Sequence, residues 1–163
     1  MKSLFRVLVC MGVAFTGACR RDDISGPPTL RPGRDECAEC GMAIHEERSA
    51  AAMIVERDGR RDSLVFDDIG CLLDMEGARQ GKIVARFVHD HGSGSWIQGD
   101  TAVFVATDGS NLHTPMASGI AAYADQTGAA GGQREFGGEV LDFDALAKWR
   151  RQQVEQRRRG SGG

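Results

Sequence analysis

Short apolar runs separated by turn residues organise the chain from about residue 50 onward. Residues 51–55 form an apolar run, Asp58-Gly59 follows as a pair typical of hairpin turns, and residues 63–66 form a second apolar run. Both runs have the length of an ordinary strand. The pattern predicts two antiparallel strands joined by a tight turn.

The residues after this hairpin predict a helix and a third strand. Asp67-Asp68 offers a helix N-cap, apolar positions recur over residues 69–75, and Gly77 and Gly81 end the helix. Residues 83–89 alternate apolar and polar side chains, which is the pattern of a half-buried strand. The first half of the chain therefore reads strand, strand, helix, strand.

The second half repeats this order. A short apolar pair at 96–97 and a longer run at 101–106 predict strands, residues 115–124 predict a helix, and residues 139–143 predict a last strand. Loops of ordinary length connect these segments. We therefore expect an α+β fold: a single domain built from two ββαβ-like units.

The N-terminus has the features of an export signal. Lys2 and Arg6 supply positive charge, residues 8–15 are apolar, and the small residues 16–18 precede Cys19. This order predicts a lipoprotein-type signal peptide over residues 1–18, with Cys19 lipidated and the protein anchored to a membrane. Ordinary secretory cleavage nearby, with Cys19 as a plain thiol, is the alternative.

Polar segments flank the predicted domain. Residues 19–35 are rich in Arg, Asp, Gly and Pro and predict a flexible tether, so the folded domain is expected at 36–146. Residues 147–163 predict a basic C-terminal helix and tail. The arginines at 157–159 are interpreted as a solvated helix end, or as a patch that touches anionic lipid or an acidic partner.

Composition limits the class of protein. The chain has 163 residues, of which 41% are hydrophobic, and this is enough for one compact domain with a core. The formal net charge is −3 and the basic residues are mostly scattered. A nucleic-acid partner is therefore not expected.

The number of cysteines favours metal binding over structural disulfide bonds. Cys10 leaves with the signal and Cys19 is expected to be acylated, so Cys37, Cys40 and Cys71 remain. An odd number of thiols does not suit a purely structural disulfide framework in an oxidising compartment. Cys71 lies among apolar residues of the predicted helix, where we expect it to be buried and inert.

The Cys37-Ala-Glu-Cys40-Gly-Met42 segment is the main candidate site. Thiols and thioethers favour soft ions, above all Cu(I), and Gly41 allows the backbone to bend so that Cys40 and Met42 face one point. Two other interpretations stay open. One is a thiol-disulfide oxidoreductase, which usually has its motif at a helix N-terminus after a strand, and the other is a structural zinc site, which usually needs four ligands.

Other polar and sulfur-containing residues have simpler interpretations. Met53 and Met75 lie in apolar runs and are expected in the core, whereas Met42 and Met116 lie beside turn residues and are candidate ligands. Helix capping explains Asp67-Asp68 without a metal. The His89-Asp-His91 segment places two imidazoles on one strand face, and a solvated loop is the expected outcome there.

Several motifs together resemble the NosL copper lipoproteins associated with nitrous oxide reductase. Each motif alone is weak, but their order and spacing over about residues 37–146 are specific. They are Cys37-x-x-Cys40-Gly41-Met42-x-Ile44, Phe66-Asp67-Asp68-Ile69-Gly70-Cys71-Leu72, Trp96-Ile97, Thr114-Pro115-Met116-x-Ser118-Gly119 and Gly137-Gly138-x-Val140-Leu141-x-Phe143.

The resemblance implies a periplasmic, membrane-anchored Cu(I) chaperone that is not an enzyme. Its implied role is delivery of copper to nitrous oxide reductase, with the help of a membrane ABC-type assembly complex. The implied ligands are Cys40, Met42 and Met116, with Cys37 as an alternative sulfur donor and His113 as a possible nitrogen donor. The implied fold, a pair of ββαβ units, agrees with the hydrophobic pattern.

Overall fold

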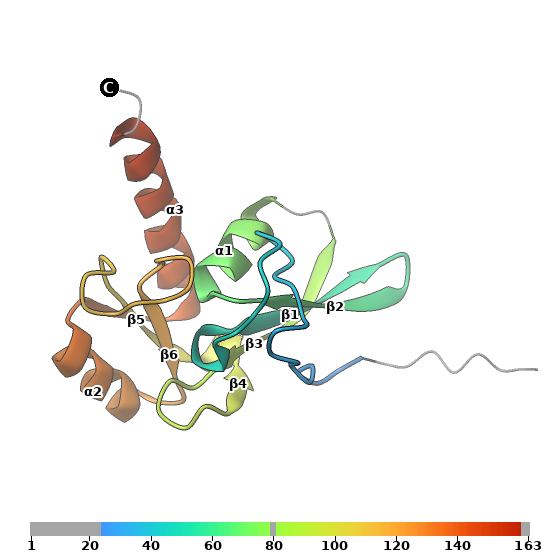
Figure 1. The fold of residues 1–163 in the computed structure, drawn as a ribbon, viewed down its shortest axis with the longest axis horizontal. Coiled ribbons are helices and arrows are strands. Elements are labelled where there is room, and N and C mark those ends of the chain that lie inside the picture. Colours follow the sequence, from blue (N-terminus) through green and yellow to red (C-terminus); the bar gives the residue numbers. More distant parts are fainter. Residues whose placement is uncertain (1–23, 79–80, 161–163) are drawn as a thin grey trace, which may run out of the picture.

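The computed structural model describes residues 24–78 and 81–160, which form two small antiparallel sheets and three α-helices (Figure 1). The predicted signal peptide and the predicted lipidation site Cys19 lie outside the described residues. Among the described helices, none is both long and apolar enough to cross a bilayer.

The first unit contains a four-stranded sheet in the order β2-β1-β3-β4. The hairpin, the helix and the third strand lie where the hydrophobic pattern predicts them. Their bounds are β1 Ala51–Arg57, β2 Arg60–Phe66, α1 Ile69–Ala78, β3 Lys82–His89 and β4 Trp96–Gln98. Two 3-10 turns flank the sheet, at Glu47–Ser49 and Gly99–Thr101.

The second unit contains a three-stranded sheet in the order β6-β5-β7. Its elements are β5 Val103–Ala106, β6 Ile120–Tyr123, α2 Gln126–Phe136 and β7 Glu139–Leu141. In both units the first strand lies in the centre, the second pairs on one side and the strand after the helix pairs on the other. The predicted pair of ββαβ units in one α+β domain is confirmed.

The prediction of a helix at residues 115–124 is wrong. Residues 120–123 form strand β6, and the helix of the second unit follows it as α2. All four residues of β6 are buried, so the sequence shows no alternation there. The helix α2 was missed because it contains three glycines, which are poor helix formers.

Packing explains one of these glycines. A Cβ atom on Gly132 would lie 2.1 Å from the Tyr123 hydroxyl oxygen, so only glycine fits beneath the tyrosine ring. The helix starts at an ordinary cap, because the Asp125 carboxylate accepts a hydrogen bond from the Gly128 backbone N–H at 2.8 Å. The contact with Tyr123 and the Asp125 cap therefore stabilise α2 although its residues have a low helix propensity.

One hydrophobic core joins the two units. It includes Met53 of β1, Leu72 of α1, Phe104 of β5 and Leu146 of α3 (Phe143–Gly160), each fully buried. The expected C-terminal helix is present, and its first half packs on this core. Figure 1 shows its second half extending beyond the sheets.

The described part of the expected tether contacts the domain. The Gly33 backbone N–H donates to the Ile44 carbonyl at 2.7 Å, and the Ile44 N–H donates to the Asp35 carbonyl at 2.9 Å. Ile24 packs against a small apolar cluster on the other face of the first sheet. The folded body therefore begins before residue 36, as it also extends into α3 beyond residue 146.

Candidate metal centre

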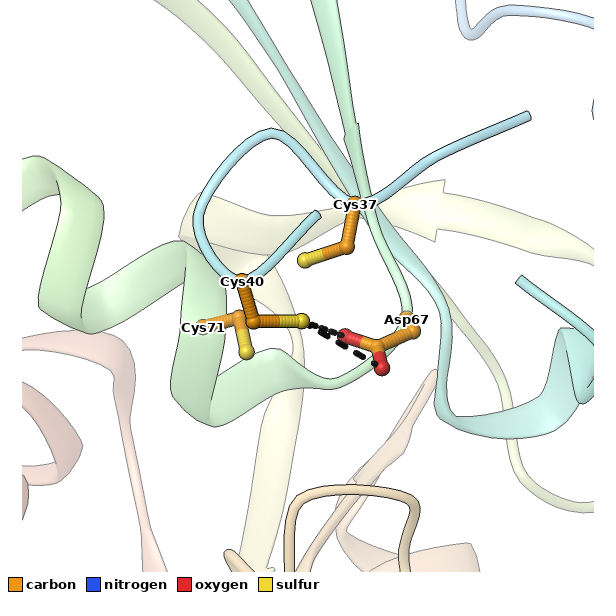
Figure 2. A group of neighbouring side chains, drawn as sticks. All are labelled: Cys37, Cys40, Asp67 and Cys71. Atoms are coloured by element: carbon orange, nitrogen blue, oxygen red, sulfur yellow. Dashed lines mark hydrogen bonds between the residues drawn. The ribbon is translucent and has the colours of Figure 1, made fainter. Parts of the chain in front are cut away.

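A tight loop ahead of β1 carries Cys37 and Cys40. The Cys37 N–H donates to the Met42 carbonyl at 2.8 Å, and the Gly41 N–H donates to the Cys37 carbonyl at 2.9 Å. Gly41 has a φ of 76°, a left-handed conformation that costs glycine little. The loop thereby turns both thiols toward the start of α1 (Figure 2).

Asp67 and Cys71 face these thiols from the segment that ends β2 and begins α1. The ligand atoms of Cys37, Cys40, Asp67 and Cys71 all lie within 4.8 Å of one another (Figure 2). Cys37, Asp67 and Cys71 are buried, whereas Cys40 is partly exposed. We call this set the thiol cluster. Within the described residues it is the one group of three or more His, Cys, Asp or Glu side chains with this spacing.

The two aspartates before α1 have different roles. The fully buried Asp68 caps the helix, since its Oδ1 accepts from the Gly70 N–H at 2.6 Å. Asp67 does not cap the helix but faces the thiols, and both of its oxygens lie 3.8 Å from the Cys40 Sγ, which donates to them. The expectation that capping explains the pair holds for Asp68 only.

The environment of Cys37 favours its thiolate. A hydrogen bond from the Cys71 side chain lowers the pKa of Cys37 to about 4, against the opposing effect of burial, with help from the backbone N–H groups of Cys40 and Asp67. The same hydrogen bond raises the pKa of Cys71, since ionising Cys71 would remove its proton from that bond.

The remaining two groups hold their protons more tightly. Burial and then the neighbouring Cys37 raise the pKa of Asp67 to about 6, and burial raises the pKa of Cys40. The metal-free cluster therefore favours a thiolate at Cys37 and keeps protons on the Cys40 and Cys71 thiols. A cation entering the cluster replaces those protons, which is how thiol sites normally load.

The structure brings together only part of the predicted ligand set. Cys37 and Cys40 lie in the thiol cluster. Met42 follows Cys40 on the same loop but is 55% exposed, and His113 is exposed on the loop between β5 and β6. Met116 is partly buried and packs on the same core as Cys37 and Cys71.

Asp67 and Cys71 are the cluster members that the sequence did not assign. Cys71 is buried, as expected, at 3% exposure, but its Sγ faces the other two thiols, so the expected inert role does not fit its position. Two features of the sequence pointed toward their role: the odd number of thiols, and the position of both residues close to the predicted start of the helix. Neither shows that a loop 27 residues before Asp67 folds against them.

The two histidines at the end of β3 do not share a site. His89 is buried and stacks on Trp96, with ring centroids 3.8 Å apart, and His91 lies edge-on to Phe136. Their rings contact aromatic neighbours on different elements. The structure thus gives this pair a packing role.

A largely buried group of three thiols and one carboxylate, built on paired ββαβ units, defines a protein suited to holding a soft metal ion. The sequence profile of NosL matches residues 29–149, and the chain belongs to the NosL family.

Among solved structures, the fold is similar to that of the copper chaperone NosL from Shewanella denitrificans. The match has a TM-score of 0.53 and 22% sequence identity, and it covers 72% of this chain and 96% of that chain. At this identity the similarity concerns the fold. No curated protein matches the chain.

Proposed function

We propose that this protein is a copper chaperone that holds Cu(I) at the thiol cluster outside the cytoplasm. The observation that carries the proposal is the convergence of Cys37, Cys40 and Cys71 from two separate segments onto one point. Thiolates are the ligands that Cu(I) prefers, and two or three of them satisfy it. Membership of the NosL family supports the same function.

The exposure of the cluster suits transfer of a cargo ion. Cys37 and Cys71 are almost completely buried, whereas Cys40 is partly exposed and Met42 beside it is open to solvent. An incoming sulfur or imidazole ligand can therefore reach the ion from the side of Cys40 before the buried thiols release it. The protein performs ligand exchange and no catalytic chemistry.

The recipient and the location are further parts of the proposal. Resemblance to the NosL family supports delivery to nitrous oxide reductase with an ABC-type membrane complex. The pattern of residues 1–19 supports export and a lipid anchor at Cys19 in the periplasm. Labelling with a palmitate analogue, with and without Cys19→Ala, tests the anchor.

Competition with a Cu(I) chelator, without oxygen and under reducing conditions, tests the function. We expect Cys40→Ser to weaken Cu(I) binding by more than the roughly 10–100-fold that changes to outer-shell partners cost, because it removes a ligand directly. Met75→Leu is the control, because it removes a sulfur of α1 that lies outside the cluster. This variant should bind Cu(I) with the affinity of the wild type. Equal affinity in the wild type and Cys40→Ser would exclude Cys40 as a ligand, and equal affinity also in Cys37→Ser and Cys71→Ser would exclude the cluster as the copper site.

A zinc-stabilised domain is the second candidate, because the cluster offers four donors including the Asp67 carboxylate, which is a common Zn²⁺ ligand. Metal analysis after anaerobic purification separates the two candidates. One equivalent of Zn²⁺ whose removal unfolds the chain would favour zinc. The oxidoreductase alternative is less favoured, since Cys37 and Cys40 lie in a loop and not at a helix N-terminus.

A further inference from the structure

The buried carboxylate of Asp68 connects the thiol cluster to the loop that carries Met116. Its Oδ2 accepts hydrogen bonds from the Thr114 hydroxyl at 2.7 Å and from the Met116 backbone N–H at 3.0 Å. Its Oδ1 binds the first turn of α1 at Gly70. One side chain thus holds both the helix that presents Cys71 and the loop between β5 and β6.

Thr114 organises that loop. Besides donating to Asp68, its Oγ1 accepts from the backbone N–H groups of Ser118 at 3.0 Å and Gly119 at 3.3 Å. Gly119 has a φ of 68°, and a Cβ atom there would lie 2.7 Å from the Thr107 Oγ1. The segment from Thr114 to Gly119 is therefore folded around one hydroxyl group and has little room to rearrange.

The same loop packs directly on the start of α1. A Cβ atom on Gly70 would lie 2.7 Å from the Ser118 Cβ, so glycine at position 70 allows the loop to approach. Ser118 is 1% exposed. Since Cys71 is the next residue of the helix, this contact brings the loop of the second unit beside the thiol cluster of the first.

We infer that Asp68 and Thr114 are positioning residues that hold Met116 beside the thiol cluster, so that its thioether completes the Cu(I) site from the second unit. The inference rests on the proposed function. Asp68 acts through two backbone-anchoring hydrogen bonds and does not contact the ion. Met116 is partly buried against the same core as Cys37 and Cys71, and its backbone N–H is held by Asp68, one residue after Asp67 of the cluster.

A double-mutant cycle on Cu(I) affinity tests this inference. Thr114→Val removes the hydroxyl at nearly constant volume, and Met116→Leu removes the thioether. We expect Thr114→Val to weaken Cu(I) binding by about 10–100-fold, the usual effect of a partner that orients a ligand. In the Met116→Leu background the same change should have little further effect, because both variants remove the same interaction. Thr114→Ser retains the hydroxyl and should restore affinity.

A second measurement follows the position of Met116 without metal. With ¹³C-methyl methionine labelling, the Met116 signal should lie apart from that of the exposed Met42 in the wild type and in Thr114→Ser. In Thr114→Val it should move toward the Met42 position, while the fully buried Met53 signal stays in place and shows that the fold is intact.

The outcomes separate the two proposals. Wild-type protein that does not bind Cu(I), but whose Met116 signal depends on the Thr114 hydroxyl, would overturn the copper function and leave the positioning role standing. Copper binding that is lost in Cys40→Ser but unchanged in Thr114→Val, or weakened equally in both Met116 backgrounds, would overturn the positioning role alone.

Discussion

At the level of single residues, the neighbours Asp67 and Asp68 divide two tasks between the two faces of one chain segment. Asp68 binds backbone N–H groups and the Thr114 hydroxyl, whereas Asp67 faces the three thiols. A carboxylate beside thiols adds a hard donor to a soft set. Asp67 therefore bears on which ion the cluster prefers.

Asp67→Asn tests this role in selectivity. The change removes a hard anionic donor but leaves every sulfur in place, so we expect Zn²⁺ affinity to fall by about tenfold or more and Cu(I) affinity to change less. Parallel competition titrations with the two ions, on wild type and variant, measure the ratio. A larger loss for Cu(I) than for Zn²⁺ would show that Asp67 binds the copper ion itself.

The residues of this site differ in how far the sequence reveals them. Cys37 and Cys40 are recognisable because their spacing alone suggests chemistry. Cys71 has the local signature of a core residue, and only the fold shows that its sulfur faces the loop. A residue whose role depends on a long-range contact carries no local mark of that role.

At the level of elements, the contrast between α1 and α2 shows where pattern reasoning works. The helix α1 follows a clear cap and carries an apolar stretch, so its position is predictable. The helix α2 contains Gly128, Gly131 and Gly132, and the strand before it is buried throughout, so both local signals fail. The reason for Gly132 is the Tyr123 side chain of that strand, which the local sequence of the helix does not contain.

Two neighbouring glycines of α2 provide a matched pair of variants. Gly132→Ala forces a methyl group into the Tyr123 ring, and such overpacking should destabilise the protein by about 1–3 kcal/mol. Gly131→Ala meets no atom closer than 3.9 Å, so removing a helix glycine should stabilise it by about 0.5–1 kcal/mol. Urea unfolding measures both. Equal effects of the two changes would contradict the packing explanation for Gly132.

At the level of the whole molecule, α3 fastens the second unit to the first. Arg150, at 8% exposure, donates to both carboxylate oxygens of Asp74 in α1, at 3.0 and 2.7 Å. The arginine comes from the helix that follows β7, and the carboxylate comes from the helix that precedes β3. This bidentate pair therefore supports the common core between the units.

Arg150→Ala should destabilise the protein by about 1.5–3 kcal/mol, the usual range for hydrogen bonds to charged groups. Arg151→Ala, at the next and exposed position of the same helix, should change stability by no more than about 0.5 kcal/mol. Thermal or urea unfolding of the two variants gives the comparison. An equal loss of stability in both variants would show that it comes from helix propensity and not from the ion pair with Asp74.

The thiol cluster joins two pieces of backbone, the loop ahead of β1 and the first turn of α1. An ion bound by these sulfurs, as proposed, would cross-link the two segments. The metal-loaded protein would then be more rigid at this edge than the metal-free protein. If a recipient docks at this edge, that difference in rigidity would let it distinguish the metal-loaded protein from the metal-free protein.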